Sequence, residues 1–313
     1  MRQTTLLTGT SDPSIDIGFA EYLQAKFSLD ERSLNPQVRA LLVHSLQGRP
    51  EIRSLDLGTG TGAMLRRLIE WELTDSLVLT GLDLQPELLD QVGTIIEGLL
   101  RDRGYVVRRE QPHWQAERAG QLVVLNLHAS ELVDYHPDQP NFDLITAQAF
   151  MDIVPLEDTL RQVKGWLKPG GLFYATLNYD GGTQLFPSFR EGALEARLLA
   201  NYDQSMERRR VDGKPTGGSH SGARLVAALL DGGFELLGYG SSDWNMTPER
   251  GHYRDQDATC LQAILECIRQ EGGAAGGFSD SELNQWFLDR LERIRAGHLG
   301  LIVHQLDILA GRR

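Results

Sequence analysis

The sequence predicts an α/β fold in which a mostly parallel sheet carries helices on both faces. Short apolar runs alternate with amphipathic helical segments over residues 52–177, which is typical of parallel sheets. Runs such as 77–79 and 123–125 are apolar at every position, as expected of strands buried on both sides. A composition of 41% apolar and 24% charged residues supports a globular chain with a sizeable core.

The elements follow in order along the chain. Residues 1–51 predict an N-terminal helical cap, with Ile17, Tyr22 and Phe27 at helical spacing and Pro36 opening a further helix. The core at 52–177 contains the first five strands, expected at 52–57, 77–82, 121–127, 142–147 and 172–177. Helices are expected through 64–69, from Pro86 to residue 100, and at 159–167.

The second half of the chain interrupts this alternation. Residues 178–232 are expected to form an insertion, because glycine pairs such as Gly181-Gly182 usually end an element. We expect this insertion to form a substrate lid. A sixth strand follows in 233–244, a helical insertion in 245–297 with helices around 261–268 and 283–294, and a last strand in 298–313.

Charge and composition exclude several classes of protein. The chain has 31 Lys and Arg against 43 Asp and Glu, a net charge of −12, which disfavours a nucleic-acid substrate. No run approaches the roughly 20 apolar residues that span a bilayer, and the first residues do not form a signal peptide. We therefore expect a soluble, cytoplasmic protein with no membrane partner. Cys260 and Cys267, seven residues apart, fit helix packing, and the scattered histidines predict no metal site.

The strongest motif lies between the first strand and the next helix. Asp56-Leu57-Gly58-Thr59-Gly60-Thr61-Gly62 lets the backbone turn sharply and approach a ligand closely. Asp83 ends the second strand, where a carboxylate can accept hydrogen bonds from a ribose diol. Asp83 could instead cap the helix that begins at Pro86, and Asp56 could brace the loop rather than contact a ligand.

These residues, together with Phe142-Asp143-Leu144-Ile145 and Leu167-Lys168-Pro169-Gly170-Gly171, resemble the class I S-adenosylmethionine (SAM)-dependent methyltransferases. The resemblance covers residues 52–177, and 222–240 more loosely. It implies a seven-stranded sheet whose last strand is antiparallel, SAM as cofactor and S-adenosylhomocysteine (SAH) as product. SAM would lie across the ends of the first, second and fourth strands.

The resemblance also implies roles for individual residues. Asp56 and Gly58 would face the methionine part of SAM, Gly60 and Gly62 the ribose, and Asp83 the ribose hydroxyls, with Thr59 in the same loop. Leu84 would lie against the adenine. An acidic residue that often follows the third strand is replaced here by His128-Ala129-Ser130, so Ser130 or a backbone carbonyl could recognise the adenine amine. Ala147 and Gln148 would border the transferred methyl group.

The acceptor is less well defined. The fourth strand lacks the Asn/Asp-Pro-Pro-Tyr/Phe signature of adenine and glutamine-amide methyltransferases, which favours an oxygen or nitrogen of a small molecule. His220, in a polar glycine-rich loop, is the candidate general base. Tyr22, Asn178, Tyr179 and Trp244 are candidate substrate contacts.

Two alternatives remain open at this point. Gly58-x-Gly60-x-x-Ala63 also fits the looser dinucleotide fingerprint of a nicotinamide-dependent oxidoreductase, although no Tyr-x-x-x-Lys pair follows. A SAM-binding protein without transfer activity would carry the same loop. The sequence leaves open the acceptor, the pathway and the oligomeric state.

Overall fold

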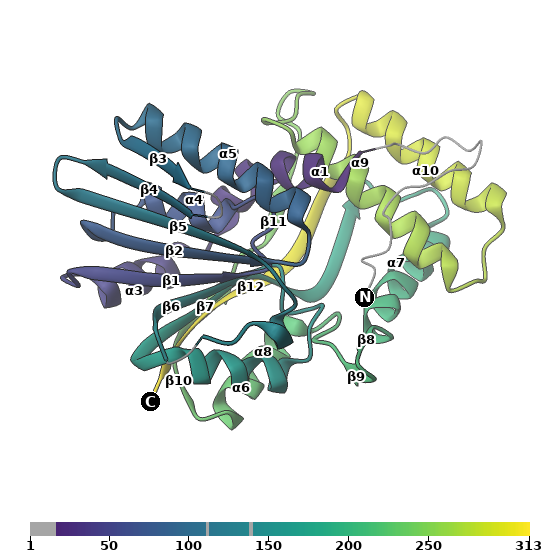
Figure 1. Ribbon diagram of the computed structural model, residues 1–313. Helices are drawn as coiled ribbons and strands as arrows, with labels where there is room; N and C mark the ends of the chain where they lie inside the picture. The colour runs from purple at the N-terminus through teal and green to yellow at the C-terminus, as the bar shows by residue number, and fades with distance from the viewer. Residues whose placement is uncertain (1–16, 111–112, 138–139) are drawn as a thin grey trace.

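The computed structural model describes residues 17–110, 113–137 and 140–313. Residues 1–16 of the predicted cap lie outside this part of the chain. Within it, one ten-stranded sheet forms the centre, in the order β10-β12-β7-β6-β1-β2-β5-β4-β3, with β11 paired to β12 (Figure 1). Its strands are β1 (Glu51–Leu57), β2 (Ser76–Asp83), β3 (Val106–Glu110), β4 (His113–Arg118), β5 (Gln121–Ala129), β6 (Phe142–Gln148), β7 (Leu167–Phe186), β10 (Phe234–Ser241), β11 (Trp244–Met246) and β12 (Gly300–Arg312). A separate hairpin pairs β8 (Arg210–Val211) with β9 (Lys214–Pro215).

The pairing of the strands confirms the predicted fold class. β1 lies parallel to both β2 and β6, β2 is parallel to β5, and β6 is parallel to β7. β12 is antiparallel to its neighbours β7 and β10. The seven expected strands are therefore present, and the last of them is the antiparallel one. The β3–β4 hairpin, which the sequence prediction lacked, extends the sheet beyond β5.

Helices cover both faces of the sheet. The helices are α1 (Phe19–Ala25), α2 (Phe27–Ser33), α3 (Pro36–Leu46), α4 (Ala63–Glu70), α5 (Pro86–Asp102), α6 (Leu156–Trp166), α7 (Gly192–Glu207), α8 (Ser221–Asp231), α9 (Asp257–Cys267) and α10 (Asp280–Arg295), with the short turns η1 (Leu132–Asp134) and η2 (Ile268–Gly272). α3, α4 and α5 pack their apolar side chains against one face, and α6 and α8 pack against the other. α8 was expected within the substrate lid, but its buried Leu225 and Leu229 make it a covering helix of the sheet.

The predicted end of the fifth strand at Leu177 is wrong, because β7 continues to Phe186. Its pairing with β12 runs from Gly300 opposite Phe186 to Gly311 opposite Leu172. The register shifts between Val303 and Gln305, where β7 passes through Gly181 and Gly182, both at φ +77°. Glycines tolerate this left-handed backbone, so the pair forms a bulge inside the strand and does not end it.

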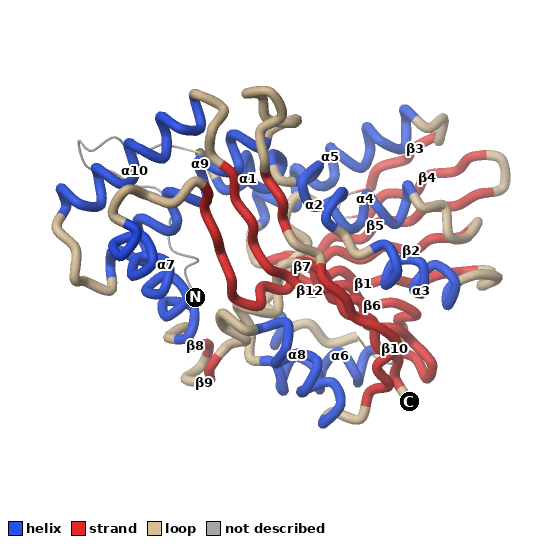
Figure 2. The backbone as a smooth tube through the Cα atoms, turned by 180° about the vertical axis from the view of Figure 1, so that it is seen from behind, coloured by secondary structure: helices blue, strands red, loops and turns tan. Residues whose placement is uncertain are grey.

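The two long strands carry a second group of helices away from the sheet (Figure 2). α1, α7, α9 and α10 surround the outer parts of β7 and β12, and we call this group the helical lobe. Its core is apolar, with Trp286 and Phe287 fully buried. α10 begins with a capping box in which Ser279 and Glu282 exchange hydrogen bonds between side chain and backbone. No helix in the described ranges is both long and apolar enough to cross a membrane.

A buried carboxylate ties the N-terminal helices to the two long strands. Asp307 on β12 is fully buried, and its oxygens accept hydrogen bonds from the backbone N–H groups of Asn35 (2.7 Å) and Leu177 (2.8 Å). Asn35 is also the N-cap of α3, where its side chain accepts from the N–H groups of Gln37 and Val38. Asp307 therefore fixes both the start of α3 and the backbone of β7.

Replacement of Asp307 by alanine is expected to destabilise the protein. It would leave the buried N–H of Leu177 and the part-buried N–H of Asn35 without acceptors, so the free energy of unfolding should fall by about 1–3 kcal/mol for the first and by less for the second. Urea unfolding followed by circular dichroism measures this. Asp231→Ala, at the exposed end of α8, is the control and should change stability by less than about 0.5 kcal/mol. Equal stability of the two variants would contradict the role of Asp307.

Candidate active site

The glycine-rich loop connects β1 to α4 at the carboxyl edge of the sheet. Gly58, Gly60 and Gly62 all have positive φ, at +61°, +54° and +82°, which L side chains rarely adopt. A Cβ on Gly58 would in addition lie 2.3 Å from a ring carbon of Phe150. A hydrogen bond from the Thr59 N–H to the Leu82 carbonyl, at 3.0 Å, joins the loop to β2. The sequence motif thus forms the sharp turn that it predicts.

Asp83 lies against this loop. One carboxylate oxygen accepts the N–H of Gly60 at 2.8 Å, and the other accepts the N–H of Gln85 at 2.9 Å. Asp83 and the glycine loop, which the sequence analysis expected at one site, therefore lie in contact. Through Gln85, Asp83 also contacts the start of α5. The neighbouring Leu84 is 47% exposed, an apolar side chain left open beside the carboxylate.

Asp56 faces inward and braces the loop. It is buried, and its two oxygens accept hydrogen bonds from the hydroxyls of Thr59 (2.6 Å) and Thr146 (2.7 Å). Burial raises the pKa of Asp56 to about 6, against the opposing effect of the two threonine hydrogen bonds. Both oxygens thus have protein partners, as the bracing alternative in the sequence analysis expected.

The ends of the third and fourth sequence-predicted strands, β5 and β6, complete this edge. Ala129 is paired with Asp83, and the N–H of Ser130 donates to the Asp83 carbonyl at 3.0 Å. His128 is half-buried, and burial, with a smaller effect of His113, lowers its pKa. Ala147 on β6 is buried and paired with Leu57. These residues all lie near the loop, although the side chain of Ser130 bonds to the Glu131 carbonyl.

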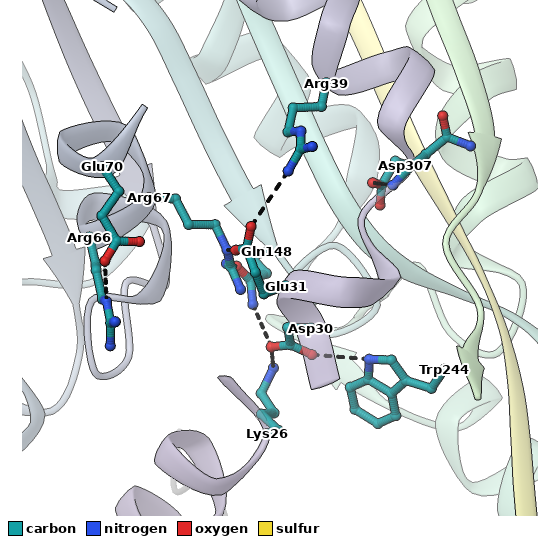
Figure 3. Close-up of polar contacts among 11 residues, drawn as sticks. Lys26, Asp30, Glu31, Arg39, Arg66, Arg67, Glu70, Gln148, Trp244 and Asp307 are labelled. Carbon is teal, nitrogen blue, oxygen red and sulfur yellow. Dashed lines mark hydrogen bonds and ion pairs between the residues drawn. The ribbon is translucent and has the colours of Figure 1, made fainter. Parts of the chain in front are cut away.

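Gln148, the last residue of β6, is held by a buried polar network (Figure 3). Its amide nitrogen donates to Asp30 at 2.7 Å, and its amide oxygen accepts from Arg67 on α4. Arg67 is fully buried and also donates to Glu31 at 2.6 Å. Asp30 was not identified from the sequence, since nothing in its helical segment marks it as more than a polar position.

Two apolar side chains lie over the glycine loop. Phe150, just after β6, packs against Gly58, and Leu23 on α1 reaches within 3.1 Å of the Cβ position of Gly60. The N-terminal helix and the segment after β6 therefore form one wall of the site, which is where the sequence placed a cap.

A cavity of about 190 Å³ lies between the helical lobe, the carboxyl end of β6 and the middle of β7. Three of the four predicted substrate residues line it, namely Tyr22, Tyr179 and Trp244. Further lining residues are Ile17, Phe19, Ala149, Asp152, Leu177, Thr183, Tyr202, Met206, Ala263, Ile264, Glu266, Cys267, Val303 and Gln305. The fourth predicted residue, Asn178, is not among them: it is buried, and its side chain donates to the Leu306 carbonyl at 2.9 Å.

His220 lies elsewhere. It is exposed at the start of α8, opposite Asp180, and is not among the residues that line the cavity. We therefore do not retain it as a general base. Asp152, which the sequence did not single out, supplies a carboxylate to the cavity instead; burial raises the pKa of Asp152, and Arg209 opposes this. Across the described ranges, no cluster of three or more His, Cys, Asp or Glu residues is arranged to hold a metal ion.

Residues 55–175 match the protein-family model described as a methyltransferase domain. This range includes the glycine loop, Asp83 and the end of β6. This part of the chain is therefore a methyltransferase domain, and its sheet has the class I fold. The match ends before most of the helical lobe, so the lobe is additional to the shared domain. A search of the curated proteins finds no match to this sequence.

Several solved structures resemble the whole chain. A candidate methyltransferase from Bacillus halodurans C-125 aligns with a TM-score of 0.50 at 15% identity, covering 89% of this chain and 99% of its own. A candidate sarcosine dimethylglycine methyltransferase from Galdieria sulphuraria gives 0.46 at 13% identity (93% and 87% covered). Geranyl diphosphate C-methyltransferase from Streptomyces coelicolor A3(2) gives 0.46 at 14% identity (97% and 88% covered). At such low identity the first of these supports the fold alone, and the other two are too distant to indicate an acceptor.

The protonation of Asp56 predicts a pH dependence of stability. Its folded pKa of about 6 is above the ordinary value of about 3.9, so the folded state binds this proton more tightly than the unfolded chain. The resulting stabilisation is present below about pH 4 and is lost as the pH rises to about 6, up to about 3 kcal/mol in total. Asp56→Asn, which does not titrate, should lose less stability across this range in urea unfolding. A loss as large as that of the wild type would contradict the raised pKa.

Proposed function

We propose that this protein transfers the methyl group of SAM to an oxygen or nitrogen atom of a small molecule and releases SAH. The cavity beside the methyltransferase domain is the observation that carries this proposal. Its wall includes Ala149, which follows Gln148 at the end of β6, and Leu177 in the middle of the neighbouring strand β7. A volume of about 190 Å³ is below the roughly 300–1,000 Å³ typical of sites for drug-sized ligands, which favours a small acceptor.

The backbone at this junction supports the same interpretation. Ala149 and Leu177 both have positive φ, +47° and +55°, although neither is glycine. The N–H of Ala149 donates to the carbonyl of Thr176 at 2.9 Å, and Asp307 holds the N–H of Leu177. Such backbone strain costs about 1–3 kcal/mol per residue and is concentrated at active sites and ligand clamps. We infer that the strain serves to shape the acceptor cavity.

The residues at the carboxyl edge fit SAM. Each Asp83 oxygen accepts one N–H group, and because a carboxylate has about four acceptor positions, Asp83 can also accept the ribose hydroxyls. The exposed Leu84 suits the adenine face, and the positive φ of Gly58 and Gly60 gives the sharp turn that places the loop backbone beside Asp83. His128, Ala129 and Ser130 would lie near the adenine, and Ala147 and Gln148 near the methyl group.

Bound SAM supplies an electrophilic methyl group on a positively charged sulfur. The protein's contribution is then mainly to hold the acceptor in line with that methyl group and to exclude water, which can supply a large part of the rate. The aromatic walls formed by Tyr22 and Trp244 suit this role. The Asp152 carboxylate is positioned in the cavity to receive a proton from an acceptor hydroxyl or amine.

Calorimetric titration tests the proposal. SAM and SAH should each give saturable binding, and NADH should give none; binding of NADH in their place would favour the oxidoreductase alternative. Release of SAH in the presence of a mixture of small alcohols, phenols and amines distinguishes an enzyme from a SAM-binding protein without transfer activity. Saturable SAM binding with no turnover on any acceptor would support a SAM-binding protein without transfer activity.

Replacement of Asp83 by alanine should raise the dissociation constant for SAM about 10- to 100-fold, because two charge-assisted hydrogen bonds to the ribose are lost. Calorimetry measures the change, and circular dichroism checks that the variant is folded. Asp90→Asn, on the exposed side of α5, is the matched control and should bind SAM as the wild type does. Unchanged affinity in Asp83→Ala would exclude ribose binding at this carboxylate.

A further inference from the structure

The cavity wall combines aromatic rings with acidic groups. Five aromatic residues line it, and their rings have negatively polarised faces that attract cations: Phe19, Tyr22, Tyr179, Tyr202 and Trp244. Asp152 and Glu266 add two carboxylates, and no Lys, Arg or His is found among the described residues that line the cavity. This composition favours a positively charged ligand over a neutral or anionic one.

The charge balance around the wall leaves a negative excess at Asp152. Glu266 is neutralised by Arg269, which donates to both of its oxygens at 2.9 and 2.7 Å. Asp152, in contrast, shares a single guanidinium with Glu271: Arg209 contacts Asp152 at 3.3 Å and Glu271 at 2.9 Å. Two carboxylates thus face one cation on that side of the cavity.

Trp244 already shows the attraction between this wall and a cation. The ammonium of Lys26 lies 5.6 Å from the centroid of the Trp244 ring. Lys26 itself is not one of the residues that line the cavity. Asp30 neutralises that ammonium at 2.7 Å and also accepts the indole N–H at 3.0 Å. The indole is therefore fixed in place, and Lys26 adds no uncompensated positive charge to the cavity.

Gln305 supplies an independent indication of a ligand with hydrogen-bond donors. Its side chain is only 4% exposed and lines the cavity, yet its Oε1 accepts no hydrogen bond from any residue that the structure describes. A buried amide oxygen without a donor is destabilising, because it has lost its hydrogen bonds to water and gained none in the protein. An N–H group of a ligand in the cavity is a donor of the kind that this oxygen lacks.

We propose that the acceptor is an aliphatic amine, recognised in its ammonium form by the aromatic wall, Asp152 and Gln305. This inference rests on the proposed methyltransferase function and narrows its acceptor to nitrogen. The ammonium first gives a proton to Asp152, which frees the nitrogen lone pair. The lone pair forms the new C–N bond as the C–S bond breaks, the sulfur keeps the bonding electrons and leaves as SAH, and the product is again a cation.

A pair of matched probes tests this with a binding measurement. N,N-dimethylethanolamine is cationic at neutral pH, and 3-methylbutan-1-ol has the same shape with carbon in place of nitrogen. In calorimetry with SAH present, the amine should bind at least about tenfold more tightly, as expected for a desolvated cation against aromatic rings. Equal affinities, or no binding of the amine, would overturn the inference.

Single substitutions test which residues bind the amine. Asp152→Asn and Tyr22→Leu should each weaken amine binding about tenfold and leave the affinity for SAH unchanged. Asp158→Asn is the matched control: this carboxylate is on α6, pairs with Lys214 of β9 and does not line the cavity, so the variant should bind the amine as the wild type does. If SAH binds but only alcohols are methylated, the amine inference fails and the methyltransferase proposal stands; if SAH does not bind, the proposed function itself fails.

Discussion

The geometry of the site depends on one buried carboxylate, Asp30. It accepts hydrogen bonds from Lys26, Gln148 and Trp244, and so joins the N-terminal helices, the end of β6 and strand β11. A buried charge is costly unless it is fully hydrogen-bonded, and loss of any one partner leaves part of that cost uncompensated. The neighbouring Lys26 and two donors from distant parts of the sequence are therefore held in a single arrangement, which places the Trp244 indole in the cavity wall.

The second constraint is the continuity of β7 and β12 across two parts of the molecule. Near the sheet centre these strands pair as members of a methyltransferase-like sheet, and beyond the bulge at Gly181-Gly182 they form the base of the helical lobe. Because the lobe is joined to the sheet by paired strands and not by a single loop, the end of β6, the middle of β7 and the lobe helices share one cavity. The left-handed Leu177 sits at the transition and is held there by Asp307.

Local sequence patterns were enough to predict the parallel sheet, the glycine loop and the position of Asp83, because alternation of apolar runs and the need for glycine act over a few residues. The long extension of β7 was missed because a glycine pair marks a turn in most contexts, whereas here it fits a bulge. Asp30 was missed for a different reason. Its partners Gln148 and Trp244 are separated from it by 118 and 214 residues, so only the tertiary structure brings them together. Asp152 and Gln305 likewise acquire a role only from the cavity that they line.

The electrostatics of the cavity bear on which acceptor can react. When a neutral amine takes a methyl group from a sulfonium, positive charge moves from sulfur to the acceptor nitrogen, toward the Asp152 and Glu271 side of the wall. In the proposed reaction Asp152 has by then taken the ammonium proton and is neutral, so the aromatic faces of the wall are the groups that can stabilise the cationic nitrogen in the transition state. A hydroxyl acceptor would instead develop negative charge as it loses its proton, close to the same carboxylates. Under the proposed function, the negative excess at Asp152 thus favours an ammonium at binding, and the aromatic wall favours a cationic nitrogen over a developing alkoxide at the bond-forming step.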